Sequence, residues 1–304
     1  MLFRSHIILL DDVIRYCLSD IFSILGYDTF KAYALKFTRD AELDLDNDVN
    51  KSFLEVMTES VEKRKHGEPV RFVYDLEMPD RLLQKLLKKL KIAKEDTKRA
   101  GGRYHNFRDF MSFPTIPNPD LYFKPFPPLP HPLLPDNKSI ISAIKQQDIM
   151  LHYPYHSFSY IIDLLREASM DPAVKEIKMT FYRAAKDSSL INALISASRN
   201  GKKVTVFLEV QARFDEEANI YWANRMQEEG VKIIPIIPGF KVHAKLLVIK
   251  RMEGEHIRLY ANISTGNFNE STATVYADDS LLTAHQGITR SEEHTSELQS
   301  RFGI

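Results

Sequence analysis

Apolar residues in the first part of the chain recur at two different periods. Between residues 9 and 25 they return every three or four positions, at 10, 13, 14, 17, 18, 21, 22 and 25, which predicts a helix with one apolar face. We expect further helices over 46–65 and 79–92, and strands over 33–38 and 69–74. Together these segments predict an α+β domain over residues 1–113, with its own start only partly present.

From residue 139 onward, helical and strand patterns alternate. The predicted helices cover 140–147, 159–169, 189–199 and 216–229, and the predicted strands cover 177–182, 204–210, 231–237, 242–249 and 256–263. This order predicts an α/β domain over 136–289, in which helices flank a mixed sheet. We expect the strands 231–237 and 242–249, which Pro238 and Gly239 separate, to form a buried apolar pair.

The segment between the two domains is rich in proline. Residues 114–135 hold nine of the fifteen prolines, interleaved with Phe123 and Phe126. Because a flexible linker would be polar and rich in glycine, we expect a stiff segment that packs against both domains. A ligand for an SH3-type domain is the alternative interpretation.

The last residues differ from the rest of the chain. Residues 290–304 begin RSEEHTSELQS, which resembles the translation of a sequencing-adapter oligonucleotide. We therefore exclude them from the fold and expect them to be disordered and to pack against nothing.

Composition limits the possible partners. The 304 residues include 41 Lys+Arg and 41 Asp+Glu, so no global field attracts a polyanion, and phosphate binding must come from local clusters. The single cysteine, Cys17, excludes a disulfide within the chain, and no apolar run reaches the roughly eighteen residues of a membrane span. We expect a cytoplasmic protein with no nucleic-acid partner and no integral membrane segment. Peripheral contact with a membrane stays open.

Several basic residues have two interpretations. The lysines of the predicted helix 79–92 could contact polyphosphate, but a solvated helix face explains them as well. Gly101, Gly102 and Arg103 could admit a phosphate, although a plain turn is an equal explanation. The chain contains no G-x-x-x-x-G-K-[ST] pattern, so any nucleotide binds without a P-loop.

The strand 242–249 carries the most specific candidate chemistry. Alternation places Lys241, His243 and Lys245 on one face of it. Neighbouring positive charge disfavours the imidazolium and leaves a ring nitrogen free to attack, while the lysines would neutralise an incoming phosphate. A histidine packed in the core is the simpler alternative.

Other residues that suit phosphate lie at strand ends. Arg183 and Arg213 follow the strands 177–182 and 204–210, and Asn267 and Asn269 lie in a glycine turn after the strand 256–263. Ligands of open α/β sheets bind beyond the carboxyl ends of strands, and arginine suits bidentate phosphate contact. We therefore expect both arginines to point into one cavity with His243. Two unrelated surface arginines are the alternative.

The pairing of H-x-K with G-x-x-N resembles the phosphate site of the phospholipase D superfamily, although the usual Asp after the Lys is absent. Five longer blocks resemble the polyphosphate kinase family, namely HYPYHSF from His152, FYRAAKDS from Phe181, VQARFDEEANI from Val210, KVHAKL from Lys241 and TGNFNE from Thr265. The resemblance covers residues 2–288. It implies an ATP:polyphosphate phosphotransferase, of which the chain holds a middle domain and a truncated first phospholipase D-like domain.

The resemblance also implies roles for particular residues. His243 would be the catalytic nucleophile that forms a phosphohistidine, with Lys245 beside it. Asn267, Asn269 and Tyr276 would bind substrate or ATP, and Arg183 and Arg213 would contact phosphate and Mg²⁺. The partners would be ATP or ADP and inorganic polyphosphate, and the full-length enzyme would be a homo-oligomer. Because the second catalytic half does not follow, we expect this fragment alone to be inactive.

Two other functions stay open at this point. A phosphodiesterase of the phospholipase D type could use the same histidine without ATP. A non-catalytic module that binds phosphate or polyphosphate would need no turnover at all.

Overall fold

The computed structural model describes residues 6–39, 53–65, 69–92, 98–116, 118–124, 126–135, 138–182, 185, 187–209, 216–235 and 243–290. The chain divides into two compact units. The first consists of Met1–Asp44 and Glu62–Pro125, and the second consists of Leu45–Val61 and Phe126–Ile304. The helix α3 (Phe53–Lys65) spans a division between them.

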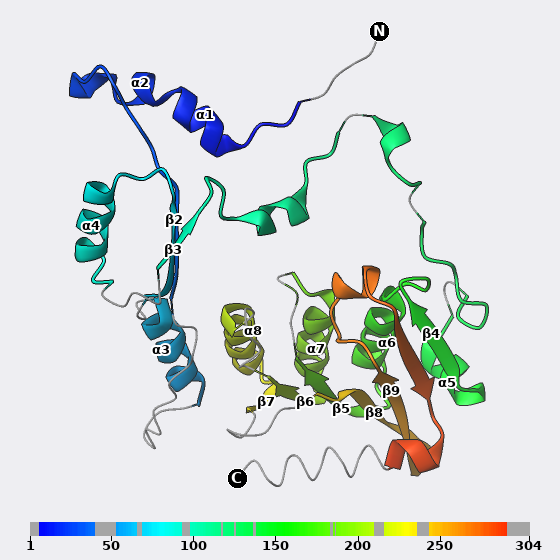
Figure 1. Cartoon of the computed structure of the whole chain (residues 1–304). Coiled ribbons are helices and arrows are strands. Elements are labelled where there is room, and N and C mark those ends of the chain that lie inside the picture. The colour runs from blue at the N-terminus through cyan, green and yellow to red at the C-terminus, as the bar shows by residue number, and fades with distance from the viewer. Residues whose placement is uncertain are drawn as a thin grey trace. The chain divides into compact units, whose positions relative to one another are not determined.

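The first unit is built on a three-stranded sheet in the order β1-β2-β3 (Figure 1). Its strands are β1 (Leu35–Arg39), β2 (Pro69–Asp75) and β3 (Lys98–Gly101). β1 is antiparallel to β2 and β3 is parallel to it. The helix α4 (Asp80–Lys89) covers the sheet because its leucine stripe packs on Phe72, and its lysines lie on the exposed face. β3 was not expected, since the sequence there suggested only a turn.

The predicted helix over 9–25 is wrong as a single element. The structure divides it into α1 (Leu10–Tyr16), α2 (Leu18–Ile21) and the 3₁₀ helix η1 (Ser23–Leu25). None of the three contains a buried residue. An apolar stripe that buries nothing receives little stabilisation as a long helix, because packing rather than propensity supplies most helical stability.

The second unit is an α/β structure with a seven-stranded mixed sheet. Its helices are α5 (Ile140–Gln146), α6 (Ser159–Met170), α7 (Ser189–Arg199) and α8 (Glu216–Glu228). Its strands are β4 (Ile149–Tyr153), β5 (Val174–Phe181), β6 (Lys203–Leu208), β7 (Lys232–Pro235), β8 (Lys245–Glu253), β9 (His256–Ser264) and β10 (Asp278–Thr283). The predicted class, an α+β unit followed by an α/β unit with a mixed sheet, is confirmed.

The strand order is β4-β10-β9-β8-β5-β6-β7. β5, β6 and β7 are parallel, whereas β8, β9, β10 and β4 join on the other side of β5 through antiparallel pairs. The expected pairing of the strands now identified as β7 and β8 is therefore wrong, because β6 and β5 lie between them. β7 continues the parallel order, but β8 reverses direction and pairs with the far side of β5. β4 and β10 were not expected as strands.

This topology gathers many segments at one edge of the sheet. The carboxyl ends of β4, β5, β6, β7 and β9 lie there with the amino ends of β8 and β10. The register confirms this arrangement, since Lys245 pairs with Ser264, Ser264 pairs with Ser280, and Ser280 pairs with Leu151. We call this the site edge.

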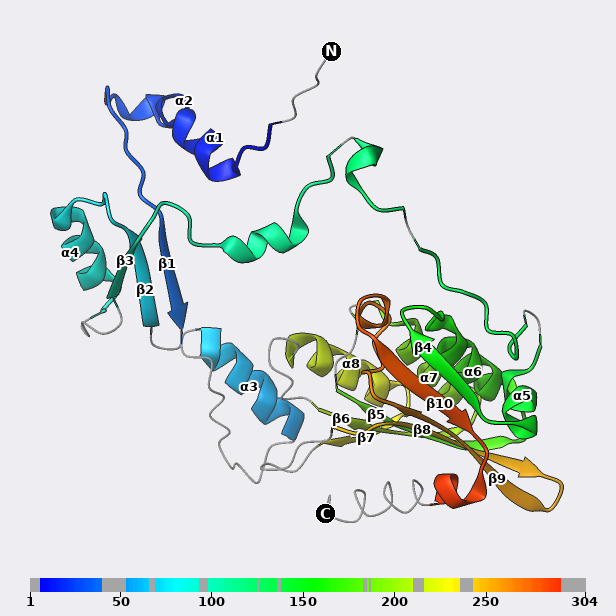
Figure 2. The same ribbon diagram turned by 45° about the vertical axis from the view of Figure 1, so that its right-hand side comes forward.

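The helices α6, α7 and α8 lie along one face of the sheet in both views (Figures 1 and 2). Their buried side chains and those of the central strands form the core, which includes Leu165, Leu194, Met226 and Ile177. The end of the proline-rich segment belongs to this unit, because Leu129 N donates to Tyr155 O at 2.7 Å and His131 N donates to the Tyr160 hydroxyl. No helix in the described part of the chain is long and apolar enough to cross a membrane.

Candidate functional site

His243 lies in the connection just before β8, not within a strand. The expectation that His243 and Lys245 alternate along one strand face is therefore wrong. The ladder between β5 and β8 is interrupted here because the Thr180 hydroxyl donates to Ala244 O at 2.7 Å and accepts from Leu246 N at 2.9 Å. As a result, His243 is exposed at the site edge, whereas Lys245 is buried.

Lys245 and His243 are in direct contact. The Lys245 Nζ lies 2.9 Å from His243 Nδ1 and donates to His243 O at 2.6 Å. The Tyr182 ring meets the imidazole edge to face at 5.7 Å, and Lys245 Nζ lies 5.9 Å from the centre of the same ring. The end of β5 and the start of β8 thus hold the imidazole and the amine together.

Two proton arrangements satisfy the 2.9 Å contact between Nζ and Nδ1. A charged Lys245 would donate to Nδ1 and leave the ring proton on Nε2, where it blocks attack. A neutral amine would instead accept from Nδ1–H and leave Nε2 with its lone pair. Burial lowers the pKa of Lys245 and favours the second arrangement, although the negative charge of Asp278 acts in the opposite direction. Loss of one proton from the pair therefore converts the resting form, with a charged Lys245, into the attacking form, with a neutral Lys245.

Gly266 is required where the turn after β9 meets β10. A Cβ at Gly266 would lie 2.4 Å from Asp278 Oδ2 and 2.8 Å from Asp278 Cβ, so the Asp278 side chain would have to move. The carboxylate is held there by the Thr265 hydroxyl, which donates to Asp278 Oδ1 at 2.8 Å. Asp278, whose negative charge acts on Lys245, is thus a carboxylate that the sequence motifs did not indicate. The glycine of the G-x-x-N pattern was its only sequence signal.

The two asparagines of the turn have different surroundings. Asn269 is buried, and its Oδ1 accepts from Ser271 N, Ser271 Oγ and Thr272 N, so this oxygen closes the following turn. Asn267 Oδ1 is also buried but has no hydrogen-bond partner among the described residues. An unpaired buried oxygen costs free energy unless a ligand or water satisfies it. Because phosphate oxygens accept hydrogen bonds, a phosphate contact from Asn267 would have to come from its side-chain nitrogen and not from this oxygen.

Three of the predicted cations fall outside the described residues, namely Arg183, Arg213 and Lys241. Their shared cavity with His243 therefore stays a prediction. The strand ends before the two arginines are firmly held, since the fully buried Asn219 of α8 donates to Tyr182 O at 3.1 Å and to Glu209 O at 2.8 Å. Tyr276 is exposed between the turn and β10, and no described contact joins it to His243.

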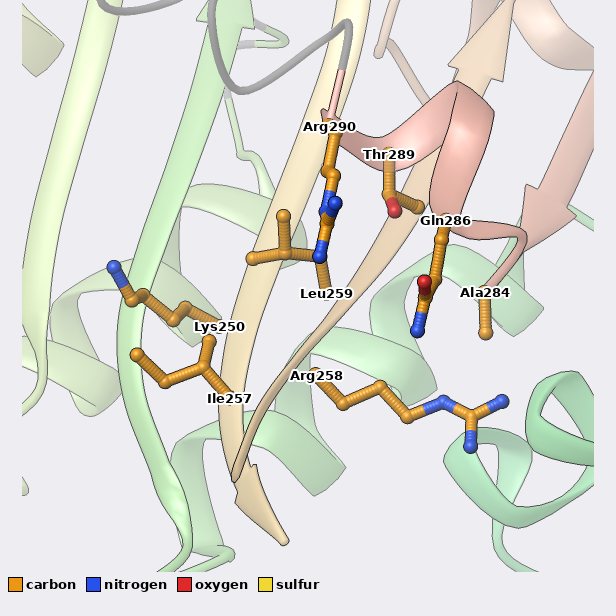
Figure 3. A pocket seen from close by; sticks show the side chains of 8 residues that line it. All are labelled: Lys250, Ile257, Arg258, Leu259, Ala284, Gln286, Thr289 and Arg290. Carbon is orange, nitrogen blue, oxygen red and sulfur yellow. The ribbon is translucent and has the colours of Figure 1, made fainter. Parts of the chain in front are cut away.

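A second group of cations lies at the opposite edge of the sheet. Lys250, Arg258 and Arg290 line a small cavity of about 220 Å³ beside β8 and β9. The close view shows the ends of Lys250 and Arg258 pointing away from each other (Figure 3). Divergent cations cannot hold one phosphate between them, so the site edge is the better candidate.

Comparison with known families identifies the family to which the chain belongs. A family model described as "Polyphosphate kinase C-terminal domain 1" matches residues 139–299, and one described as "Polyphosphate kinase middle domain" matches residues 3–113. The chain belongs to the polyphosphate kinase family. The first match includes part of the segment after residue 289, so the attribution of that segment to an adapter stays a prediction.

Comparisons with individual polyphosphate kinases support this assignment. The polyphosphate kinase of Yersinia pestis is 50% identical over 287 residues, which are 94% of this chain and 42% of the relative. The polyphosphate kinase of Vibrio cholerae is 50% identical over 301 residues, which are 99% of this chain and 42% of the relative. The crystal structure of the polyphosphate kinase from Porphyromonas gingivalis matches with a TM-score of 0.69 and 36% identity, covering 92% of this chain and 39% of the other. The chain therefore spans less than half the length of these polyphosphate kinases.

Proposed function

We propose that this chain carries the nucleophile of an enzyme that transfers the γ-phosphate of ATP to inorganic polyphosphate and back. The single observation that carries the proposal is the contact between His243 and a buried Lys245 at the site edge, in a chain of the polyphosphate kinase family. The exposed imidazole is accessible to a substrate, and the lysine can exchange a proton with it.

The proposed reaction has two steps. In the first, His243 Nε2 attacks the γ-phosphorus, the bond to the β,γ-bridging oxygen breaks, and ADP leaves with the electron pair. In the second, a terminal oxygen of polyphosphate attacks the same phosphorus and the imidazole leaves. Lys245, the side-chain amide of Asn267 and the backbone of the turn would stabilise the transferred group, which is most of what such catalysis requires. Arg183 and Arg213 belong to the proposal as further phosphate contacts.

Mg²⁺ enters the proposal with the substrate phosphates and not as a metal bound by the described residues. Among the described residues, no three His, Cys, Asp or Glu side chains come together as a metal site. Arginine cannot ligate a cation, and Mg²⁺ commonly binds through substrate phosphates and water with one or two carboxylates. The described residues therefore do not fit a resident metal, and we assign no step to it.

The test is to incubate the complete enzyme with γ-labelled ATP and Mg²⁺ and to look for label that is acid-labile and base-stable. We expect one label per chain, lost in His243→Ala and retained in His256→Ala, which changes an exposed histidine at the start of β9. Label that persists in His243→Ala would remove this residue as the nucleophile.

The 304-residue chain alone should form little or no label. It spans 42% of the length of the polyphosphate kinase of Yersinia pestis, so an acid–base partner supplied by the rest of such an enzyme would be absent from the assay. Such assistance contributes about a hundred- to ten-thousand-fold in rate. Stoichiometric label at the rate of the complete enzyme would show instead that one half suffices.

A further inference from the structure

The end of the proline-rich segment, residues 126–135, is attached to the second unit between β4 and α6. We call this segment the strap. Its Leu129 N donates to Tyr155 O at 2.7 Å, and its His131 N donates to the Tyr160 hydroxyl at 2.9 Å. Leu129 also forms an isolated backbone bridge with His156. The attachment thus consists of a few hydrogen bonds at one end of the sheet.

The strap buries little apolar surface. Phe126, Leu129 and Leu133 are exposed, and only Leu134 among its large apolar side chains is buried in the described part of the chain. Burial of apolar surface is the main stabilising contribution in a folded chain. A segment that lacks it opens locally at low cost in free energy. The few polar contacts of the strap therefore decide whether it stays attached.

Two histidines meet where the strap contacts the unit. The rings of His131, in the strap, and His156, before α6, lie edge to face with their centres 5.0 Å apart. Each ring accepts a backbone N–H at Nδ1, since Leu133 N donates to His131 at 3.2 Å and His152 N donates to His156 at 2.9 Å. Both contacts require a ring nitrogen that carries no proton.

Protonation of these rings opposes the attachment in two ways. An imidazolium carries a proton on both nitrogens, so it cannot accept from a backbone N–H. Two charged rings at this distance would also repel each other. Among the described residues, neither His131 nor His156 has a carboxylate partner that would offset the repulsion.

Other titratable groups face the pair. They are His152, whose Nδ1 lies 2.6 Å from Asp279 Oδ1, the hydroxyls of Tyr155 and Tyr160, and Glu270, which lines a cavity together with His156. Glu270 Oε2 is buried and has no hydrogen-bond partner among the described residues. Of these residue types, only histidine ordinarily changes its charge between pH 5 and 8.

The surroundings favour the neutral form of His156. Burial lowers the pKa of His156, and the neighbouring His131 and His152 lower it further, in spite of the Glu270 carboxylate in the same cavity. A detached strap removes His131 from this ring and uncovers it. His156 therefore binds a proton more readily when the strap is detached than when it is attached.

We propose that the His131–His156 pair makes the attachment of the strap sensitive to pH, so that the strap is held while both rings are neutral and is released when they are protonated. Release would remove one wall of the cavity of about 600 Å³, because Phe126, Pro127 and Pro128 of the strap line it. The inference does not depend on the transfer reaction proposed above.

The sign follows from the lowered pKa. The ordinary pKa of histidine is 6.5, and that of His156 in the attached state lies below it. The attachment is therefore fully present above pH 6.5 and is lost as the pH falls below this value toward the pKa of the attached ring.

The experiment measures hydrogen exchange of single amides in the 304-residue chain by NMR. The protection factors of the Leu129 and His131 amides should fall at least about threefold from about pH 7.5 to about pH 5. The amide of Val206, in the buried strand β6, should keep its protection. A parallel loss at Val206 would indicate unfolding of the whole unit and would overturn a local release.

The role of the pair is tested by His156→Asn, in which an amide oxygen replaces Nδ1 as the acceptor and cannot be protonated in this range. The protection of the Leu129 amide should then no longer depend on pH. His256→Asn, which changes an exposed histidine at the start of β9, is the matched control and should retain the wild-type dependence.

A second variant serves if His156→Asn leaves the strap detached at every pH. In His131→Asn, the side-chain oxygen can still accept from the Leu133 amide, because asparagine forms this contact with the residue two positions on. The pH dependence at Leu129 should weaken in this variant. Constant protection in the wild-type chain, or wild-type dependence in both variants, would overturn the proposal.

Discussion

The charged side chains at the two ends of β8 differ in whether they form ion pairs. At its far end, Arg251 donates to Asp171 at 2.7 Å and to Glu253 at 3.0 Å, and Glu253 also accepts from Lys145 at 2.6 Å. At the site edge, Lys245 is more deeply buried than any of these, yet among the described residues it makes no ion pair. Its hydrogen-bond contacts are with the ring and the carbonyl of His243, and its amine also lies over the Tyr182 ring.

This difference separates charges that stabilise the fold from charges available for chemistry. A buried charge without an opposite partner carries a desolvation cost that is not recovered in the folded chain. Such uncompensated groups are typical of functional sites, where the substrate supplies the missing charge. The far end should therefore respond to mutation through stability, and the site edge through activity.

The largest effect is expected for Lys245→Met in the complete enzyme. Loss of the amine that accepts the Nδ1 proton in the attacking form should lower the rate of His243 labelling by about a hundred- to ten-thousandfold. The melting temperature should stay the same or rise, because a desolvated amine is removed. Lys250→Met, at the other end of the same strand, is the control and should leave labelling unchanged. A fall in melting temperature with normal labelling would reverse the assignment of the two ends.

The next effect is expected for Glu253→Gln. Burial alone would raise the pKa of Glu253, but hydrogen bonds from Lys145, Tyr260 and Arg251 outweigh it and lower the pKa to about 2. Against an ordinary value of 4.5, this shift corresponds to about 3 kcal/mol of unfolding free energy. Because the folded pKa is depressed, that stability is fully present above pH 4.5 and is lost as the pH falls toward 2.

Urea denaturation of the chain at several pH values measures this contribution. Glu253→Gln should be less stable at pH 7 and should lose the pH dependence of that window. Glu255→Gln changes an exposed carboxylate two residues away and should behave as wild type. An unchanged pH profile in Glu253→Gln would show that the far end does not stabilise the fold through this group.

A smaller effect is expected for Thr180→Val, which acts on the backbone of the site edge. Without the hydroxyl, the buried Leu246 N loses its acceptor and Ala244 O loses its donor. The cost should be about 1–3 kcal/mol of unfolding free energy, and Thr180→Ser should recover most of it. Labelling of His243 should fall in Thr180→Val as well, since this hydroxyl sets where β8 begins. If Thr180→Ser is as unstable as Thr180→Val, the hydroxyl is not what holds the two strands.

Sequence reasoning predicted the elements better than their neighbours. The helices α6, α7 and α8 lie within about a residue of their expected bounds, and α7 and α8 end as expected before Gly201 and Gly230. β4 and β10 were not predicted as strands. The block HYPYHSF has no regular alternation of apolar and polar residues, and β10 begins with two aspartates. The order of the strands could not be predicted from the sequence. The period of the apolar residues indicates which face of a strand is buried, but it does not indicate which strand lies beside it.

The candidate site follows the same division. The H-x-K pattern drew attention to His243 and Lys245, but it placed both on one strand face and did not predict the contact between Lys245 Nζ and His243 Nδ1. It did not reveal that Thr180 ends the ladder before His243, nor that Asp278 would pack on Gly266. Both facts depend on contacts between residues distant in the sequence, and no local pattern carries them.

The strand order has a consequence for how this unit assembles during synthesis. β4 is the first of its seven strands to leave the ribosome, yet its neighbour in the sheet, β10, is the last. Tyr153 therefore cannot pair with Asp278, and β4 cannot join the sheet, until β10 has been synthesised. Contacts between such distant residues form late and slowly. A nascent chain that has produced every strand except β10 holds β4 with an unpaired edge, which is the state most open to aggregation.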